Sequence, residues 1–297
     1  MTARFLSFLF VTMLLQLTSC KEDEEVINFI TKEDLIINAP LPNQISESSG
    51  LICVDDQSFW THNDSGDGPF LYQLDLNNQD LIRKAVLKNT SSVDWEFVTK
   101  DDNHIYIGDT GNNNGDRTDL AIHYFPTIDL QNDSITVNSL FIKYKNQSDF
   151  TKRANHNFDC EAVVPLGDDL YLFTKNRANL ETDIYKVPKA LGTYSLEKEG
   201  SISVDGLITD AAISPSKKTI CLLGYNEIED VFRPFFWLIY DFEGTDFLNG
   251  KKKLIDLDLT TQTEGVCFLN ETFIYFSSEA EGGGTARFYA VDLEAWL

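Results

Sequence analysis

Hydrophobic residues along this chain gather in short runs that polar turns separate. The runs are rich in Val, Ile, Leu, Tyr and Phe, and clusters of Asp, Asn, Gly and Ser lie between them. Beyond the N-terminal region, no long segment has apolar residues at helical spacing. Short strands separated by such turns are typical of sandwiches, barrels and propellers. The pattern therefore predicts an all-β protein.

One phrase of this pattern occurs five times. Each copy starts with small or acidic residues, runs apolar, turns, runs apolar and aromatic again, and ends in a polar cluster before another aromatic strand. The copies begin at Ser48, Val93, Asp159, Thr209 and Thr263. Their spacing of about 45 to 65 residues lies in the range of kelch-like and WD-like propeller blades.

A further strand between copies, such as "LIRKAVLK" or "SLFIKYKN", brings each unit to the four strands that a propeller blade needs. We therefore predict a single β-propeller of five four-stranded blades. Six blades are the alternative, because the second repeat is the longest. The fifth copy lacks its outer strand, and we expect a strand within 25–40, "EVINFITKEDLIINAP", to supply it and close the ring.

The N-terminus reads "MTARFLSFLFVTMLLQLTSC". One positive charge, Arg4, precedes an apolar run that is shorter than the roughly 20 residues needed to span a bilayer. These features predict a secretory signal. The ending "LTSC" resembles the bacterial lipobox, which implies a signal peptide over 1–19 and a lipid attached to Cys20. An ordinary signal peptide with an incidental cysteine is the alternative.

The acidic stretch "KEDEE" follows Cys20 directly. We expect it to belong to a tether over 20–32 that precedes a propeller domain over 33–297. It is similar to the export tag with which some Gram-negative lipoproteins reach the outer surface of the outer membrane. We therefore expect an outer-membrane lipoprotein that faces the periplasm or the cell surface.

The formal net charge is -23. A chain this acidic repels nucleic acid and anionic lipid headgroups, and it suits divalent cations. We expect a monomer that does not bind nucleic acid. The cysteines beyond Cys20 lie in or beside apolar runs, as small buried hydrophobic residues do; they are Cys53, Cys160, Cys221 and Cys267. No C-x-x-C pair predicts a zinc site, and whether any of these cysteines form disulfides stays open.

The repeat places acidic residues at one rim of the predicted channel. The first strand of a blade lines the channel and runs away from one face of the propeller, and the second strand returns to that face. The start of the first strand therefore lies beside the end of the second. Aligning the copies on the first apolar residue of strand one selects Ser49, Glu96, Glu161, Asp210 and Glu264. Carboxylates at close range raise each other's pKa, and a bound cation relieves this. Oxygen ligands favour Ca²⁺. A water-filled acidic channel without an ion is the alternative.

The tails of the second strands add a mixture of acid, amide, imidazole and ammonium groups. Such a mixture is typical of a site for a small polar ligand or of a hydrolytic site. The candidates for ligand binding are His62, Asn63, Asp64 and Tyr225. The candidates for catalysis are Asp94, Asp109, Lys175 and Glu279. Turn chemistry accounts for Asn112, Asn113 and Asp67.

The blade heads resemble those of the calcium-activated nucleotidases, the secreted apyrase family. That resemblance rests on "SSGL", "DWEFV", "DCEAV" and "TEGVCF". It implies a five-bladed propeller that holds one calcium in the channel through a serine or glutamate of each blade. The fourth blade departs from the family with "ITDAAI", which offers Thr209 or Asp210. The motifs "WTHNDSG", "DWE" and "GDTGNN" also resemble bacterial propeller lipoproteins of no assigned activity.

Together these patterns predict an exported, lipid-anchored propeller that binds Ca²⁺ in its channel and a small polar ligand on its acidic rim. The enzymatic form of this hypothesis is metal-assisted hydrolysis of a phosphate or an ester, with Asp94, Asp109 or Glu279 as the base. The alternative is a non-enzymatic surface module that binds a glycan or a protein partner.

Overall fold

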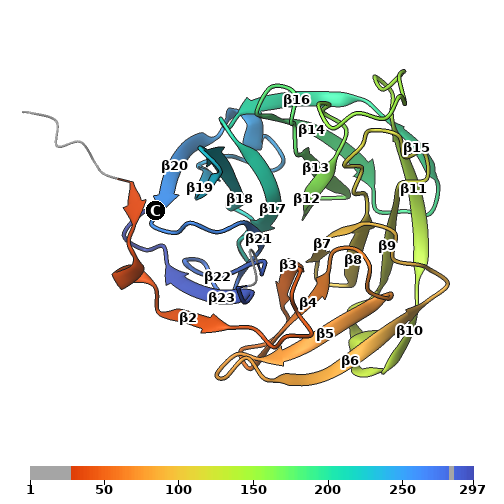
Figure 1. The fold of residues 1–297 in the computed structure, drawn as a ribbon. Helices are drawn as coiled ribbons and strands as arrows, with labels where there is room; N and C mark the ends of the chain where they lie inside the picture. The colour runs from red at the N-terminus through yellow and green to blue at the C-terminus, as the bar shows by residue number, and fades with distance from the viewer. Residues whose placement is uncertain (1–27, 281–283) are drawn as a thin grey trace, which may run out of the picture.

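The computed structural model describes residues 28–280 and 284–297. Their strands form five sheets around a central channel (Figure 1). Each sheet contains a run of four strands in which neighbours pair antiparallel, and the strand at one end of this run lies nearest the centre (Figure 1). The protein is therefore a five-bladed β-propeller, as predicted, and the six-bladed alternative is wrong.

The blades follow one another along the chain. From the channel outward, blade 1 comprises β3 (Ser48–Cys53), β4 (Ser58–Asn63), β5 (Phe70–Asp75) and β6 (Leu81–Lys88). Blade 2 comprises β7 (Trp95–Lys100), β8 (His104–Asp109), β9 (Ala121–Pro126) and β11 (Asn138–Tyr144). Blade 3 comprises β12 (Cys160–Leu166), β13 (Asp169–Thr174), β14 (Glu181–Pro188) and β16 (Lys198–Ser203). Blade 4 comprises β17 (Leu207–Ile213), β18 (Thr219–Ile228), β19 (Val231–Tyr240) and β20 (Lys251–Leu257).

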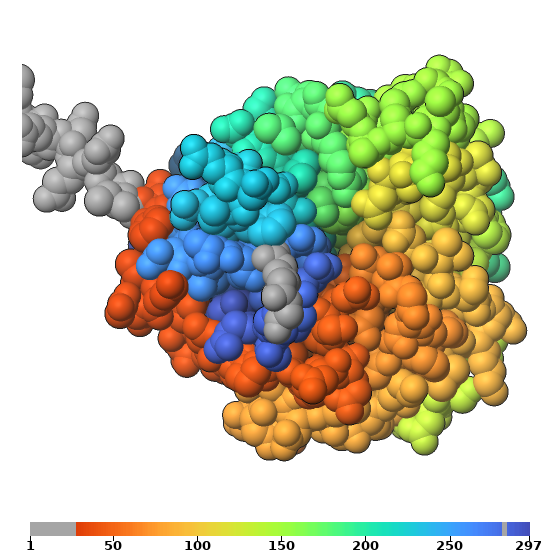
Figure 2. Space-filling model, viewed as in Figure 1, coloured from red at the N-terminus to blue at the C-terminus, as the bar shows by residue number. Residues whose placement is uncertain are grey.

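Blade 5 joins the two ends of the described chain. Its inner strands are β21 (Thr263–Phe268), β22 (Phe273–Ser278) and β23 (Arg287–Asp292). Its outer strand is β2 (Ile37–Pro40), which pairs antiparallel with β23. The predicted closure of the ring by an N-terminal strand is confirmed. Figure 2 shows the same contact as N-terminal segments in red against C-terminal segments in blue.

Three short strands add to the outer edges of blades 1, 2 and 4. They are β10 (Ser134–Thr136) on β6, β15 (Thr193–Leu196) on β11, and β1 (Phe29–Ile30) on β20, all parallel. Each comes from chain that belongs to the next blade, and each covers an edge that would otherwise expose unpaired backbone groups. The extra length of the second repeat forms β10 and the 3-10 helix η2 (Thr127–Gln131) rather than a sixth blade.

The N-terminal region bears on the expected tether. The strand β1 lies within 20–32, so the folded part begins before residue 33. The expected signal peptide and Cys20 lie outside the described residues. Two further 3-10 turns, η1 (Lys32–Asp34) and η3 (Phe247–Asn249), complete the helical elements of the described chain. In that part of the chain, no helix has the length and apolar character needed to cross a membrane.

Packing between blades explains why the inner strands read as nearly unbroken apolar runs. Both faces of an inner strand are covered, so every residue of β4 and β12 is buried. Aromatic rings fill the space between neighbouring blades, as where Phe236 of blade 4 meets Phe276 of blade 5 edge to face at 5.3 Å. The four cysteines beyond Cys20 are all buried, as predicted.

Candidate metal centre at one mouth of the channel

The first strand of every blade begins with a β-bulge, where the pairing with the second strand shifts by one residue. A bulge turns the extra residue out of the regular ladder and so re-aims its side chain. The residues at the bulges are Ser49, Glu96, Glu161, Thr209 and Glu264. The residue that the sequence alignment selects therefore coincides with the bulge in blades 1, 2, 3 and 5.

Blade 4 is the exception. The shift lies between Ile208 and Asp210, so Thr209 is the bulged residue and Asp210 is one position too far along the strand. The Asp210 carboxylate is buried and accepts backbone N–H groups of Ala211 at 2.8 Å and of Val266 at 2.7 Å. It therefore links the backbones of blades 4 and 5 and lies outside the carboxylate groups described below.

The hydroxyl groups at two bulges also link blades. The Ser49 Oγ donates to the backbone oxygen of Glu96 at 3.0 Å, and the Thr209 Oγ1 donates to that of Thr263 at 2.7 Å. Both side chains are buried. Each hydroxyl thus bonds to the start of the next blade's first strand.

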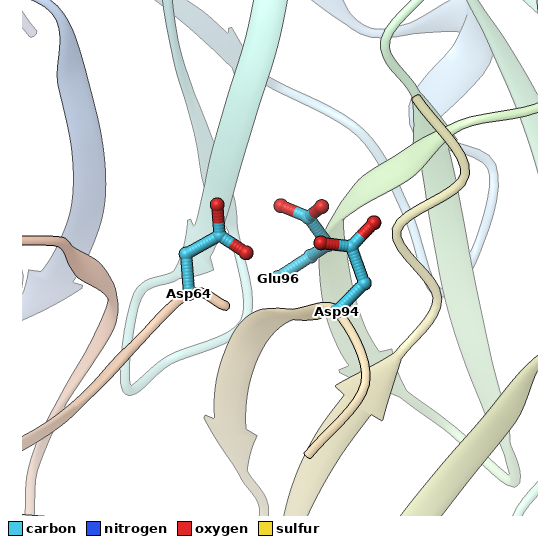
Figure 3. Close-up of side chains that lie close together, drawn as sticks. All are labelled: Asp64, Asp94 and Glu96. Carbon is cyan, nitrogen blue, oxygen red and sulfur yellow. The ribbon is translucent and has the colours of Figure 1, made fainter. Parts of the chain in front are cut away.

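Carboxylates of blades 1, 2 and 3 converge at this mouth. Asp64, Asp94 and Glu96 each place one oxygen within 4.8 Å of the others, and their side chains point toward one another (Figure 3). A second group at the same spacing contains Glu96, Asp159 and Glu161. Glu96 belongs to both. The predicted convergence of strand heads and strand tails brings Asp64, from the tail of β4, to the head of β7.

The tail of β8, "GDTGNN", supports these carboxylates. The backbone N–H of Asp94 donates to the Asp109 carboxylate at 3.1 Å, and Asp109 pairs with Arg117 at 2.9 Å. Gly111 lies directly behind the cluster: a Cβ there would come within 2.1 Å of Glu96 Oε1 and 2.4 Å of Asp94 Oδ2. Only glycine allows the backbone to approach this closely.

Two asparagines of the same tail bridge blades 2 and 3. The backbone N–H of Asn112 donates to Asp159 Oδ1 at 2.7 Å, and the Asn113 amide donates to Asp94 Oδ2 at 3.4 Å. Arg177 donates to Asn113 Oδ1 at 2.7 Å. These residues orient the carboxylates, so turn chemistry alone is not their role.

The two carboxylate groups differ in their compensation by positive charge. Lys175 Nζ lies 2.7 Å from Glu161 Oε2, and both side chains are buried. Arg177 pairs with Asp159 and lies 3.7 Å from Glu161 Oε1. By contrast, the buried atoms Glu96 Oε1 and Asp64 Oδ1 have no hydrogen-bond partner among the described residues. The shortage of positive charge is therefore on the side of Asp64 and Glu96.

The pKa values reflect this shortage. Burial, with neighbouring carboxylates, raises the pKa of Asp64 to about 9 and that of Glu96 well above its usual range. Burial also raises the pKa of Glu161 to about 8 and of Glu264 to about 7, although Lys175 opposes both shifts. A cation would hold these groups ionised.

Most of the remaining candidates are engaged with the protein itself. His62 is buried, its Nδ1 lies 3.0 Å from the Asn63 carbonyl oxygen, and burial lowers its pKa to about 4. The Asn63 amide bonds to Glu47, Gln44 and Asp67. Asn63 thus holds the loop that presents Asp64, whereas the buried His62 Nε2 has no hydrogen-bond partner among the described residues.

Tyr225, Glu264 and Glu279 lie around the same mouth. The Tyr225 ring is buried, with Lys175 Nζ 5.3 Å from its centroid. Gln262 donates to Glu264 Oε1 at 2.6 Å. Glu279 lies close enough that its charge helps to raise the pKa of Asp64 and Glu264. These three residues therefore contribute to the field of the centre.

Asp159 and Arg177 are the functional candidates that the sequence reasoning missed. Asp159 has a signal in the chain, because "DCE" repeats the spacing of "DWE" and so matches Asp94. Arg177 follows Lys175 by two residues, but no sequence pattern predicts that it reaches Asp159.

Comparison with known proteins supports the fold alone. No protein-family model matches the chain, and no curated protein does. Among solved structures, the PQQ-bound aldose sugar dehydrogenase of Streptomyces coelicolor is 10% identical with a TM-score of 0.51, covering 87% of this chain and 97% of that one.

Two further structures are larger than this chain. The exo-β-1,3-galactanase of Phanerochaete chrysosporium is 11% identical with a TM-score of 0.52, covering 86% of this chain and 63% of that one. The hydrazine synthase of Kuenenia stuttgartiensis is 11% identical with a TM-score of 0.41, covering 86% of this chain and 65% of that one. The chain thus spans just under two thirds of each. At these identities, the comparisons with the dehydrogenase and the galactanase support the propeller fold and no activity.

Proposed function

We propose that this protein binds Ca²⁺ between Asp64, Asp94 and Glu96, and that the ion binds a small polar ligand at this mouth of the channel. The observation that carries the proposal is the pair of buried, unpartnered oxygens, Glu96 Oε1 and Asp64 Oδ1, within a carboxylate group of metal-binding dimensions. Leaving buried charges without compensation costs several kcal/mol, which a bound cation would remove.

The chemistry of the donors favours calcium. All three side chains offer carboxylate oxygens, and no cysteine or histidine belongs to either carboxylate group among the described residues. Calcium takes 6–8 oxygen ligands with flexible geometry, so three carboxylates would leave positions for a ligand or water. An oxygen-rich ligand such as a phosphate or a sugar suits those positions.

The surrounding cations have a positioning role in this proposal. Lys175 and Arg177 neutralise Glu161 and Asp159, and Arg117 neutralises Asp109. Asp109 and Lys175 are therefore not available as base and acid. If the bound ligand is hydrolysed, Asp94 is the candidate base, and the ion supplies the Lewis acid.

Melting curves with and without metal test the ion. For metal-free protein, Ca²⁺ at a hundredfold excess over Kd adds about 2.7 kcal/mol to the free energy of unfolding. We expect a rise in Tm of several degrees, since each kcal/mol corresponds to about 2–4 °C in a domain of this size. Glu96→Gln should abolish the rise. Superimposable curves in calcium and in chelator would overturn the site.

The matched control is Asp102→Asn. Its side chain is 87% exposed, and it lies on the loop between β7 and β8, at the other mouth of the channel. This variant loses one carboxylate as Glu96→Gln does, yet it should keep the full response to calcium. A weaker response would show that calcium acts through net charge and not through the proposed site.

A screen with and without chelator separates the two forms of the function. Turnover of phosphate or carboxylic esters that needs Ca²⁺ and is lost in Glu96→Gln would establish a hydrolase. Calcium-dependent retention of a glycan without turnover would establish a binding module. We also propose that Cys20 anchors the protein to the outer membrane, for which release of Cys20→Ala from the membrane fraction is the test.

A further inference from the structure

Two cysteines meet where the ring closes. Cys53 lies at the end of β3 in blade 1, and Cys267 lies in β21 of blade 5. These first strands are neighbours around the channel (Figure 1). The two Sγ atoms are 2.8 Å apart, and the residues are 7% and 6% exposed.

We infer that Cys53 and Cys267 form a disulfide that joins the first blade to the last. A separation of 2.8 Å leaves less than an ångström to close to the roughly 2.05 Å of a covalent sulfur–sulfur bond. A metal is the competing use of paired thiols, but a structural zinc site needs four ligands. No histidine or carboxylate among the described residues groups with this pair.

The bond would fasten the ring at its inner side. At the outer side, β2 closes blade 5 through backbone hydrogen bonds to β23. Cys53 and Cys267 are 214 residues apart in the chain, so their bond would enclose nearly all of the propeller. A cross-link over so long a loop removes much of the conformational freedom of the unfolded chain and so favours the folded ring.

A cavity gives an oxidant access to the pair. It has a volume of about 410 Å³, lies at the mouth of the channel opposite the carboxylates, and is lined by both cysteines and by Lys100. A small-molecule disulfide such as oxidised glutathione is the oxidant required. One cysteine thiolate attacks it, a glutathione thiolate leaves, and the second cysteine thiolate attacks the mixed disulfide and releases the second glutathione. Two thiols are oxidised and one disulfide is reduced to two thiols.

The other two cysteines of the described chain are a built-in control. Cys160 and Cys221 are fully buried, and neither contacts another sulfur within that part of the chain. Cys160 donates to the Ala162 carbonyl oxygen at 3.7 Å. Neither lines the cavity. Both should stay reduced under conditions that oxidise the pair.

Peptide mapping of the full chain tests the bond directly. The purified protein is incubated with oxidised glutathione, unfolded, alkylated without reductant and digested. We expect a peptide that links Cys53 to Cys267 and disappears on reduction, with Cys160 and Cys221 alkylated. Recovery of Cys53 and Cys267 as alkylated thiols, or as separate glutathione adducts, would overturn the inference.

Thermal melting gives a second readout. Reductant should lower the Tm of the oxidised wild type by roughly 5 to 15 °C, the range expected for loss of a long-loop disulfide. The double variant Cys53→Ser/Cys267→Ser should not respond to reductant, whereas Cys221→Ala should keep both the linked peptide and the response. A response retained in the double variant would place the effect elsewhere. If the double variant does not fold, the wild-type peptide map decides alone.

Discussion

Blades 2 and 3 differ from blades 1 and 4 at one shared backbone feature, the bulge that opens the first strand. Blades 2 and 3 place carboxylates there, Glu96 and Glu161, whereas blades 1 and 4 place hydroxyls, Ser49 and Thr209. The hydroxyls donate to the backbone of the next blade. The carboxylates face neighbouring acids and, in blade 3, the cation of Lys175.

The difference shows that the same β-bulge can either hydrogen-bond neighbouring blades together or present a carboxylate at the mouth of the channel. In blades 1 and 4 the bulge fastens neighbouring blades together. In blades 2, 3 and 5 it presents an acid, Glu96, Glu161 or Glu264. The carboxylates of the candidate metal centre nevertheless come from blades 1 to 3 alone, so the centre does not follow the five-fold repeat.

The largest effect is expected from removing the cation that pairs with the bulge carboxylate of blade 3. Lys175→Met leaves Glu161 buried without its partner, and breaking such a pair costs about 3–5 kcal/mol. We expect the Tm to fall by about 10 °C. The double variant Lys175→Met/Glu161→Gln should recover much of the loss. Lys145→Met, which breaks an exposed pair with Glu197, should change the Tm by less than about 2 °C. Equal losses in both lysine variants would contradict the comparison.

A smaller effect is expected from pH. The folded protein raises the pKa of Asp64 from 3.8 to about 9 and that of Glu264 from 4.5 to about 7. The unfolded chain releases these protons at a lower pH than the folded protein does. The contribution of these groups to the stability of the metal-free protein is therefore fully present below about pH 4 and is lost as the pH rises toward 9. Tm measured in chelator should fall by several degrees between pH 5 and pH 9.

Calcium should reverse this trend, because metal and protons compete for the same carboxylates. Calorimetric titration should show tighter binding and fewer released protons as the pH rises from about 6 to about 9. A metal-free Tm that rises over this range would show that the carboxylates are ionised without an ion.

The smallest effect is expected from removing the hydroxyl groups at the bulges of blades 1 and 4. Ser49→Ala and Thr209→Val each remove one buried hydrogen bond between blades, worth about 1 kcal/mol. Denaturant unfolding should show this loss in each variant. Both should keep the calcium response, since the hydroxyls bond to the protein backbone. A lost response in Ser49→Ala alone would place serine among the ligands of the ion, as the resemblance to calcium-activated nucleotidases implies.

The sequence by itself determined the five blades, the closing strand and the positions of Glu96, Glu161 and Glu264 at the rim. These are properties of short segments: strand patterns, turns and a repeat that shows where each blade begins. The choice between Thr209 and Asp210 was beyond it, because a bulge shifts the register by one residue and no single blade reveals where the shift falls. Only the tertiary structure brought Asp64 and Asp159 to Glu96, gave Glu161 its lysine, and placed Cys53 beside Cys267. Each of these contacts joins different blades or different strands, and its length depends on how the sheets pack around the channel.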